Sequence, residues 1–158
     1  LTPLIYGGTG VESENLVQPT DTIEGFESGT IPTISILSLN AGVKFLKENF
    51  SKIIEKEQKI SDFLYKKLKN IKNLEVFSKN SSKNVFSVNI KNLDSATVAN
   101  ILNEQFHICV RPGLHCAPLV HKKNKTLDCG MVRVSVDFNN TYEEIEYLIY
   151  ALNKISNA

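Results

Sequence analysis

Residues 85–106 have the sequence VFSVNIKNLDSATVANILNEQF, in which a strand pattern gives way to a helix pattern. Residues 85–90 alternate between apolar and polar types and are rich in β-branched and aromatic side chains, which favours a strand. Asp94 is a suitable N-cap for a helix that runs to about Phe106. This stretch therefore predicts a strand joined to a helix, and the other elements can be placed around it.

Similar patterns lie on both sides of this stretch. Leu74–Phe77 predicts a second strand, which the polar residues 79–84 separate from the first. Ile108–Arg111 predicts a strand that ends at a Pro-Gly pair, and Met131–Asp137 predicts another with three valines on one face. A final helix is indicated by a capping box and an apolar stripe, formed by Thr141, Glu144, Ile145, Leu148, Ile149 and Leu152. The order of these elements predicts an α+β sandwich with helices on one face of a small, mostly antiparallel sheet.

The N-terminal part of the chain has a different character. Residues 1–33 contain five of the eight glycines and three of the five prolines, which predicts extended loop. A structureless loop of this length is unusual inside a compact domain and favours either a segment that lies on a larger body or a loop that builds a site. Helical periodicity follows over residues 34–49, and Ser51 is expected to cap a second helix. Glu55 and Lys59 form an i,i+4 pair on the second helix.

Composition limits the class of protein. With 158 residues, 42% hydrophobic and 22% charged, the chain is long enough to bury a core. The net charge of +1, from 18 basic and 17 acidic residues spread along the chain, argues against a nucleic-acid partner. No apolar run approaches the roughly 20 residues needed to cross a bilayer. Because residues 1–10 also lack a signal-peptide pattern, we expect a cytoplasmic protein without membrane contact, and the start at Leu1 indicates a truncated or processed product.

The side chains best suited to nucleophilic or metal-binding chemistry lie between His107 and Cys129. All three histidines and all three cysteines lie in this stretch, but their spacings match no closed zinc pattern, so no metal site is predicted. The odd number of cysteines also matches no disulfide framework, which favours reduced thiols. Cys109 lies between two apolar residues and is expected to be buried and inert. Cys129 is expected to be incidental.

Cys116 is the candidate nucleophile of this stretch. It lies in a turn bounded by Pro and Gly, beside His115 and five residues after Arg111, where cations would favour the reactive thiolate form. Arg111 and Arg133 are the only two arginines among the 18 basic residues, and they flank the loop that contains Cys116. A planar guanidinium can hold a carboxylate or phosphate through two parallel hydrogen bonds. A pair of ordinary surface arginines remains the alternative.

Five segments of the chain together resemble one family. Residues 111–117 (RPGLHCA) are followed by 118–122 (PLVHK) and by 131–135 (MVRVS), and upstream lie Gly7-Gly8-Thr9-Gly10 and Phe26-Glu27-Ser28-Gly29-Thr30. In this order they resemble the class V aminotransferase-like enzymes, and most closely the cysteine desulfurases and selenocysteine lyases. The resemblance covers nearly the whole chain.

The resemblance implies a division of the chain and a set of roles. The parent fold would be the α/β fold type I of enzymes that use pyridoxal phosphate (PLP). Residues 1–45 would be the tail of the large PLP-binding domain and the start of a bridging helix, and residues 46–158 would be the C-terminal small domain. Cys116 would accept sulfur from cysteine as a persulfide, with alanine as the other product. The roles implied for other residues are carboxylate binding for Arg133, pocket lining for Arg111, tuning of the loop in the substrate-binding site for His115, and cofactor contacts for Gly7, Gly8, Thr9 and Thr30.

The resemblance also implies partner proteins, and the sequence departs from the family pattern at some positions. The intact enzyme would be a homodimer in which Thr30 reaches the neighbouring active site, and a sulfur-acceptor protein would dock beside Cys116. Ile31-Pro32-Thr33 stands where the family usually has Pro-Asn-Thr. Of the 18 basic residues, two are arginines and 16 are lysines. None of these lysines lies in a segment that matches the family's Schiff-base lysine, so the chain is expected to be a fragment that is inactive alone. Two alternatives stay open: another class V enzyme without a cysteine nucleophile, and a non-catalytic module that binds a carboxylate or a protein.

Overall fold

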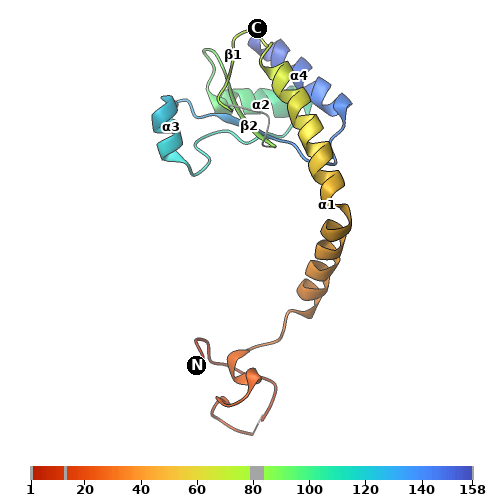
Figure 1. The fold of residues 1–158 in the computed structure, drawn as a ribbon. Helices are drawn as coiled ribbons and strands as arrows, with labels where there is room; N and C mark the ends of the chain where they lie inside the picture. The colour runs from red at the N-terminus through yellow and green to blue at the C-terminus, as the bar shows by residue number, and fades with distance from the viewer. Residues whose placement is uncertain (1, 13, 79–83, 158) are drawn as a thin grey trace. The chain divides into compact units, whose positions relative to one another are not determined.

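The computed structural model describes residues 2–12, 14–78 and 84–157. The chain divides into two compact units, Leu1–Asn49 and Phe50–Ala158. The first unit contains irregular backbone, a 3-10 helix η1 (Ile23–Phe26) and the beginning of helix α1 (Thr33–Leu68). The second unit contains the rest of α1, a sheet and three further helices (Figure 1).

Helix α1 is continuous, so the prediction of two helices with a cap at Ser51 is wrong. No glycine or proline lies between the two predicted segments, and serine inside a helix costs only a few tenths of a kcal/mol relative to good helix formers, at most about 0.7 kcal/mol. The Asn49 side chain donates to the Phe45 carbonyl oxygen at 2.9 Å, one turn earlier, rather than ending the helix. The predicted i,i+4 pair is confirmed, with Lys59 Nζ 2.7 Å from Glu55 Oε1.

The sheet has three strands in the order β1-β2-β3, all antiparallel. They are β1 (Leu74–Val76), β2 (Val85–Ile90) and β3 (Val132–Ser135). Leu74 lies opposite Ile90, and Phe86 lies opposite Val134. Because side chains alternate along a strand, this register turns the apolar positions of the strands to one face of the sheet. The predicted antiparallel sheet is confirmed, while the polar turn predicted at 79–84 lies largely outside the described residues.

Helices α2 (Ser95–Phe106), α3 (Pro118–Asn124) and α4 (Tyr142–Ser156) complete the second unit. Two predicted caps are confirmed: Asp94 Oδ1 accepts from the backbone of the first turn of α2, and a capping box opens α4. The core is formed where α1, α2 and α4 pack on the apolar face of the sheet. Its fully buried members include Ile60, Leu64, Leu68, Phe86, Val88, Val98, Leu102, Val132, Ala151 and Leu152.

Two expectations about the segment between α2 and β3 are wrong. Residues 108–111 do not form a regular strand. Within this segment only Arg111 takes part in a β-bridge, which is an isolated antiparallel bridge to Arg133. Helix α3 was not predicted, although Pro118 occupies its first turn, where the missing N–H and fixed φ of proline suit a helix start. A helix of seven residues is too short for hydrophobic periodicity to reveal.

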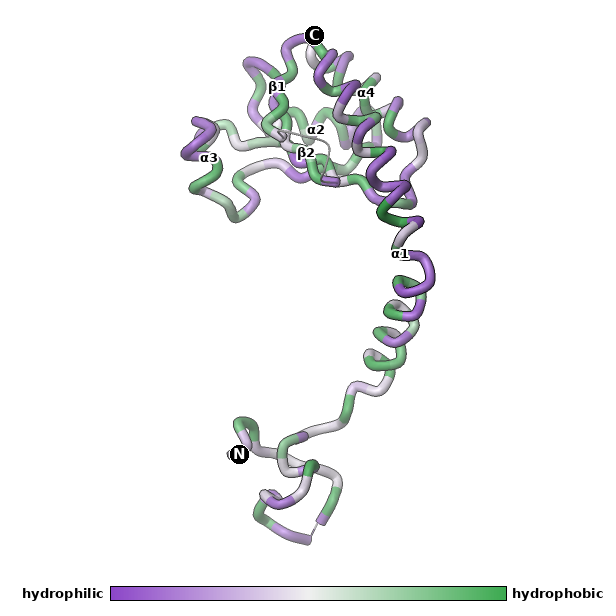
Figure 2. The backbone as a smooth tube through the Cα atoms, viewed as in Figure 1, coloured by the Kyte–Doolittle hydropathy of each residue, from purple (hydrophilic) through white to green (hydrophobic). Residues whose placement is uncertain are grey.

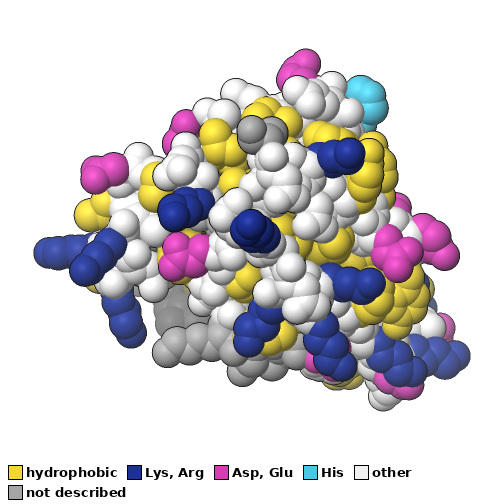
Figure 3. Space-filling view, turned by 90° about the horizontal axis from the view of Figure 1, so that it is seen from above, with side chains coloured by type: hydrophobic (Ala, Val, Ile, Leu, Met, Phe, Trp, Pro, Cys, Tyr) yellow, Lys and Arg dark blue, Asp and Glu magenta, His cyan; other side chains and the backbone are white. Residues whose placement is uncertain are grey.

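The surface carries exposed apolar side chains as well as charged ones. Figure 2 shows apolar residues recurring along the first half of α1, and the side chains of Ile34, Leu37 and Leu39 there are exposed. On the face drawn in Figure 3, basic and acidic side chains are interspersed with apolar ones. Within the described ranges, no helix is both long enough and apolar enough to cross a bilayer.

Candidate functional site

Cys116 lies at the tip of a tight turn and its side chain is exposed. The backbone N–H of Ala117 donates to the Leu114 carbonyl oxygen at 2.9 Å, which closes a four-residue turn. The two central residues both have positive φ, 52° at His115 and 56° at Cys116. Positive φ at both central positions is characteristic of a type I′ turn, which ordinarily contains Asn or Gly.

This turn is strained by its residue types. Histidine and cysteine carry a Cβ, so each pays a steric penalty in the left-handed region that glycine avoids. A non-glycine residue in a sparsely populated region costs on the order of 1–3 kcal/mol and persists only where surrounding contacts hold it. The contacts around the turn therefore determine where the Cys116 thiol points.

The base of the loop is closed by two backbone pairs. Arg111 and Arg133 exchange hydrogen bonds, N to O at 3.2 Å in one direction and 2.8 Å in the other. Gly113 and Met131 exchange a second pair, both at 3.1 Å. The two arginines that flank the loop in the sequence are thus directly opposite each other across antiparallel backbone. This confirms that they adjoin in space, while their roles remain predictions.

Close packing at Gly130 and hydrogen bonds of the Ser95 hydroxyl stabilise the base of the loop. Gly130 has φ +66°, and a Cβ at this position would lie 2.5 Å from Ser95 Oγ and 2.9 Å from Gly113 Cα. Ser95 is buried, donates its hydroxyl to the Cys129 carbonyl oxygen at 2.7 Å and accepts from Gly113 N–H at 3.2 Å. Ser95, at the start of α2, therefore joins the two arms of the loop.

Two histidines support the turn itself. The Nε2 atom of His115 lies 2.9 Å from the Arg111 carbonyl oxygen and must donate, because a carbonyl oxygen only accepts. The His115 ring meets the ring of His121 edge to face, with centroids 5.8 Å apart and planes at 62°. His121 is 1% exposed, and its Nδ1 lies 2.9 Å from Thr126 Oγ1. The turn is therefore tied to Arg111 on one side and packed on a buried ring on the other.

The side chain of Arg133 projects from the sheet face opposite the core. Val132 and Val134 are buried against the helices, so the alternation of β3 places Arg133 on the other face, opposite Ser87 of β2. Its Nε atom is buried and has no hydrogen-bond partner within the part of the chain that the structure describes. A buried guanidinium N–H without a partner is costly, and an anionic ligand would satisfy it.

The candidate cofactor residues lie in the first unit. Gly29 N–H donates to the Gly8 carbonyl oxygen at 2.7 Å, which brings the two glycine segments of that unit together. Gly7 N–H is used by Gln18 Oε1 at 2.9 Å. The Thr9 hydroxyl is within hydrogen-bonding distance of the Val11 backbone, whereas Thr30 is exposed.

The other cysteines differ from expectation in one respect. Cys109 is exposed, so the prediction that it is a buried core thiol is wrong. The residues around it form no regular strand, and its sulfur is instead 3.7 Å from Asn103 Oδ1. Cys129 is half-buried, and its sulfur lies 3.4 Å from the Gly130 carbonyl oxygen. Among the described residues, no three side chains of the His, Cys, Asp and Glu types converge to hold a metal ion.

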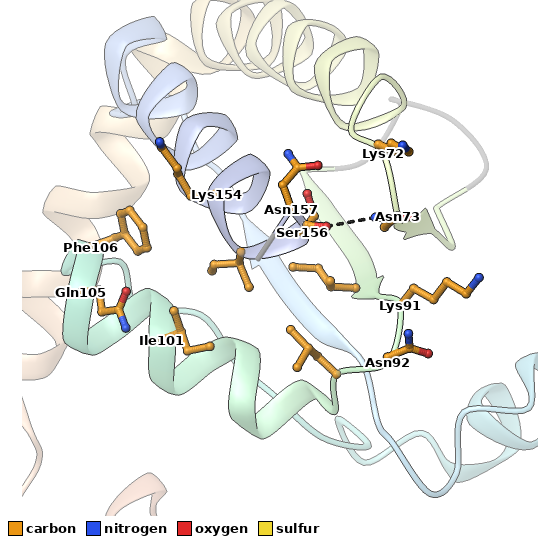
Figure 4. Close-up of a pocket in the computed structure, with 13 residues that line it drawn as sticks. Lys72, Asn73, Lys91, Asn92, Ile101, Gln105, Phe106, Lys154, Ser156 and Asn157 are labelled. Atoms are coloured by element: carbon orange, nitrogen blue, oxygen red, sulfur yellow. Dashed lines mark hydrogen bonds between the residues drawn. The ribbon is translucent and has the colours of Figure 1, made fainter.

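A separate hollow of the second unit lies between α2, α4 and the ends of β1 and β2 (Figure 4). Its volume is about 760 Å³, and neither arginine of the loop lines it. Lys72, Lys91 and Lys154 come from different elements, and Figure 4 shows that their ammonium groups do not converge on a common point. The hollow therefore lacks the grouped charge of a preformed anion site.

Comparison with known proteins shows the family of this chain. A family model described as aminotransferase class-V matches residues 1–148. The chain belongs to this family. It is 32% identical over 163 aligned positions to a probable cysteine desulfurase of Methanothermobacter thermautotrophicus, covering 99% of this chain and 40% of that relative.

Two solved structures share the fold. A cysteine desulfurase from Thermococcus onnurineus matches with a TM-score of 0.79 at 29% identity, over 98% of this chain and 39% of that one. A C-DES mutant, whose structure contains glycine covalently linked to the PLP cofactor, shares the fold with a TM-score of 0.63 at 17% identity, over 82% of this chain and 31% of that one. The chain thus spans about 40% or less of the relatives it matches.

The sequence predicted that the two arginines adjoin the loop with Cys116, but it did not indicate which residues support this loop. Ser95, His121 and Thr126 contact the loop and were not singled out. The only local signal was a second histidine six residues after His115, because the Ser95 and Thr126 contacts depend on how distant segments pack.

Proposed function

We propose that the chain is the C-terminal part of a PLP-dependent cysteine desulfurase in which Cys116 receives sulfur from L-cysteine. The observation that carries this proposal is the exposed Cys116 thiol on a strained turn whose base is formed by the paired residues Arg111 and Arg133. Membership of the class-V family, with cysteine desulfurases among the relatives, supports this reaction over other reactions of the family. Fold alone would not decide it.

The reaction transfers one sulfur atom. The Cys116 thiolate attacks the sulfur of the substrate, a new S–S bond forms, and the C–S bond of the substrate breaks. The electron pair of that bond remains on the substrate carbon, which takes a proton, so that L-cysteine and the enzyme thiol give L-alanine and an enzyme persulfide. Attack of a thiolate on sulfur requires partial ionisation and free access, and the exposed position of Cys116 provides the access.

The substrate would be held by its carboxylate. The unpartnered, buried Nε of Arg133 offers a donor that a carboxylate would satisfy. Arg111, whose backbone is paired with that of Arg133, would line the same pocket. His115 would contribute through its position beside Arg111, because its Nε2 is used by the Arg111 carbonyl oxygen.

PLP would supply the electron sink that makes the substrate sulfur electrophilic. The first unit fits contacts to its phosphate in part: a Cβ at Gly8 or Gly29 would meet no atom within 4 Å, so space beside these residues is open, and Thr30 is exposed. Gly7 and Thr9 would shape the turn, because Gly7 N–H and the Thr9 hydroxyl have local partners. The covalent anchor would come from a lysine elsewhere in the enzyme.

The assembly follows from the same proposal. Residues 1–45 would belong to the large PLP-binding domain and 46–158 to the small domain, and the enzyme would be a cytoplasmic homodimer that delivers sulfur to an acceptor protein. The exposed apolar side chains of the first unit, which include Leu16, Ile34 and Leu39, support a covering partner or domain there.

Two cysteine variants of the full-length enzyme test the proposal. Cys116→Ser is expected to reduce alanine formation from cysteine to background and to remove the persulfide from residues 111–117, because serine cannot form an S–S bond. Cys109→Ser is the matched control, since Cys109 is also an exposed thiol of the second unit, and it should keep full activity. Alanine production and mass spectrometry of the persulfide are the measurements. Undiminished alanine formation by Cys116→Ser would contradict the proposal.

A further inference from the structure

Helix α3 begins directly after the Cys116 turn, and one of its side chains is buried. Of its seven residues, His121 alone is buried, at 1% exposure. Its neighbours Leu119 and Val120 are 80% and 52% exposed. The position and tilt of α3, and with it the end of the turn at Ala117, therefore depend on His121.

The His121 ring is held in one orientation. Its Nδ1 lies 2.9 Å from Thr126 Oγ1, and Thr126 is itself buried at 5% exposure. The backbone closes the same contact, because Thr126 N–H donates to the His121 carbonyl oxygen at 2.9 Å. A buried ring with a fixed polar edge is a rigid surface, and the opposing ring of His115 lies against it at 5.8 Å between centroids.

The position of His115 in turn fixes the thiol. His115 and Cys116 are the two left-handed residues of the turn, and the Nε2 of His115 donates to Arg111 O at 2.9 Å. If the His115 ring lost the surface behind it, this hydrogen bond would loosen and the strained φ values would relax. Relaxation at Cys116 would change the direction of its side chain, because the Cβ direction follows φ.

We infer that His121 is a positioning residue, which holds the His115 ring and so keeps the Cys116 turn in the conformation that presents the thiol. This role rests on the proposed function of Cys116, but it concerns a residue that never touches the substrate. An apolar side chain at position 121 would fill the same buried space, yet it would lack the polar edge that Thr126 holds.

The test uses the full-length enzyme with PLP and four variants. His121→Ala removes the ring, His121→Phe keeps a ring without its polar edge, and Thr126→Val removes only the hydroxyl partner. Val120→Ala, an exposed position on the same short helix, is the matched control. The measurements are kcat and KM for alanine formation, the melting temperature, and the alkylation rate of Cys116 by iodoacetamide, followed by mass spectrometry of its peptide.

The expected pattern separates positioning from stability. His121→Ala should lower kcat by about ten- to a hundred-fold, as misplacement of a reacting group by about 1 Å does, and should leave KM for cysteine unchanged. It should also change the alkylation rate of Cys116, and His121→Phe, which keeps a ring but loses the contact with Thr126, should show smaller changes in both properties. Thr126→Val should show a smaller loss in the same direction, and Val120→Ala should match the wild type.

Three results would overturn the inference. They are wild-type kcat and alkylation in His121→Ala, an equal effect of Val120→Ala, and losses in His121→Phe that follow its melting temperature alone. Should His121→Ala fail to fold, Thr126→Val and His121→Phe carry the same comparison. Failure of the proposed function would be seen separately, as an active Cys116→Ser enzyme.

Discussion

Gly130→Ala should destabilise the loop around Cys116 by combining backbone strain with a steric clash. Gly130 has φ +66°, and its new Cβ would lie 2.5 Å from Ser95 Oγ, 2.9 Å from Gly113 Cα and 3.2 Å from Gly113 C. Two of these three atoms are backbone and cannot rotate away. The third is the Ser95 hydroxyl oxygen, which is itself fixed by hydrogen bonds to Cys129 and Gly113.

The magnitude has two parts. A residue with a Cβ in the left-handed region costs about 1–2 kcal/mol. Adding a methyl group to a closely packed site costs about 1–3 kcal/mol, because neighbours must shift. The free energy of unfolding of the second unit should therefore fall by about 2–5 kcal/mol in total. The shift would act first on the backbone pair between Gly113 and Met131, which adjoins the clash.

Gly113→Ala separates the two parts. Gly113 has φ +101°, but a Cβ there would meet no atom within 4 Å. This variant should show only the backbone cost of about 1–2 kcal/mol. Urea unfolding gives the free energies, and hydrogen exchange of residues 111–133 reports whether the base of the loop opens. A loss in Gly113→Ala that equals the loss in Gly130→Ala, or a Gly130→Ala enzyme within about 0.5 kcal/mol of wild type, would refute the reasoning.

Two further predictions concern single side chains. In the proposed enzyme, Arg133→Lys should raise KM for cysteine by about ten- to a hundred-fold, which is the loss expected for a charge-assisted hydrogen bond. Arg111→Lys should have a smaller effect, because Arg111 is exposed. Steady-state kinetics measure both values, and equal KM values for the two variants would contradict this prediction. Hydrogen bonds from the Thr97 hydroxyl, and then from backbone N–H groups, lower the pKa of Asp94. Its contribution to stability is therefore present above the ordinary aspartate pKa and is lost as pH falls through the lowered one. Asp94→Asn, which keeps an N-cap acceptor, should flatten the acid side of the urea midpoint against pH, and identical curves would contradict this.

Elements whose signals are local were predicted well from the sequence. The strand at 85–90, the Asp94 cap and the capping box at Thr141 each depend on residues within a few positions of one another, and all are confirmed. The prediction of a helix boundary at Ser51 is wrong, because serine permits a helix end without requiring one. The prediction that Cys109 is buried is wrong, because apolar neighbours in sequence do not ensure burial where no strand forms.

The support of the candidate site could not be predicted, because it is assembled from distant segments. Ser95 meets Cys129 across 34 positions and Gly113 across 18. No local pattern marks a buried serine as the junction of two loop arms, since serine is common at the start of any helix. The His121 and Thr126 contact spans only five positions, but it depends on a short helix that has no periodic signal.

The orientation of Arg133 is nevertheless fixed by a simple feature of the sequence. Val132 and Val134 are both buried in β3, so the residue between them must project from the opposite face. A slip of one residue in the pairing of β3 with β2 would bury the guanidinium in the core and expose both valines, which makes that register prohibitively costly. Pairing with Arg133 then fixes the backbone of Arg111 opposite it, and the loop that contains Cys116 starts from this point. The alternation of apolar residues that stabilises the sheet therefore also determines which face carries the two guanidinium groups.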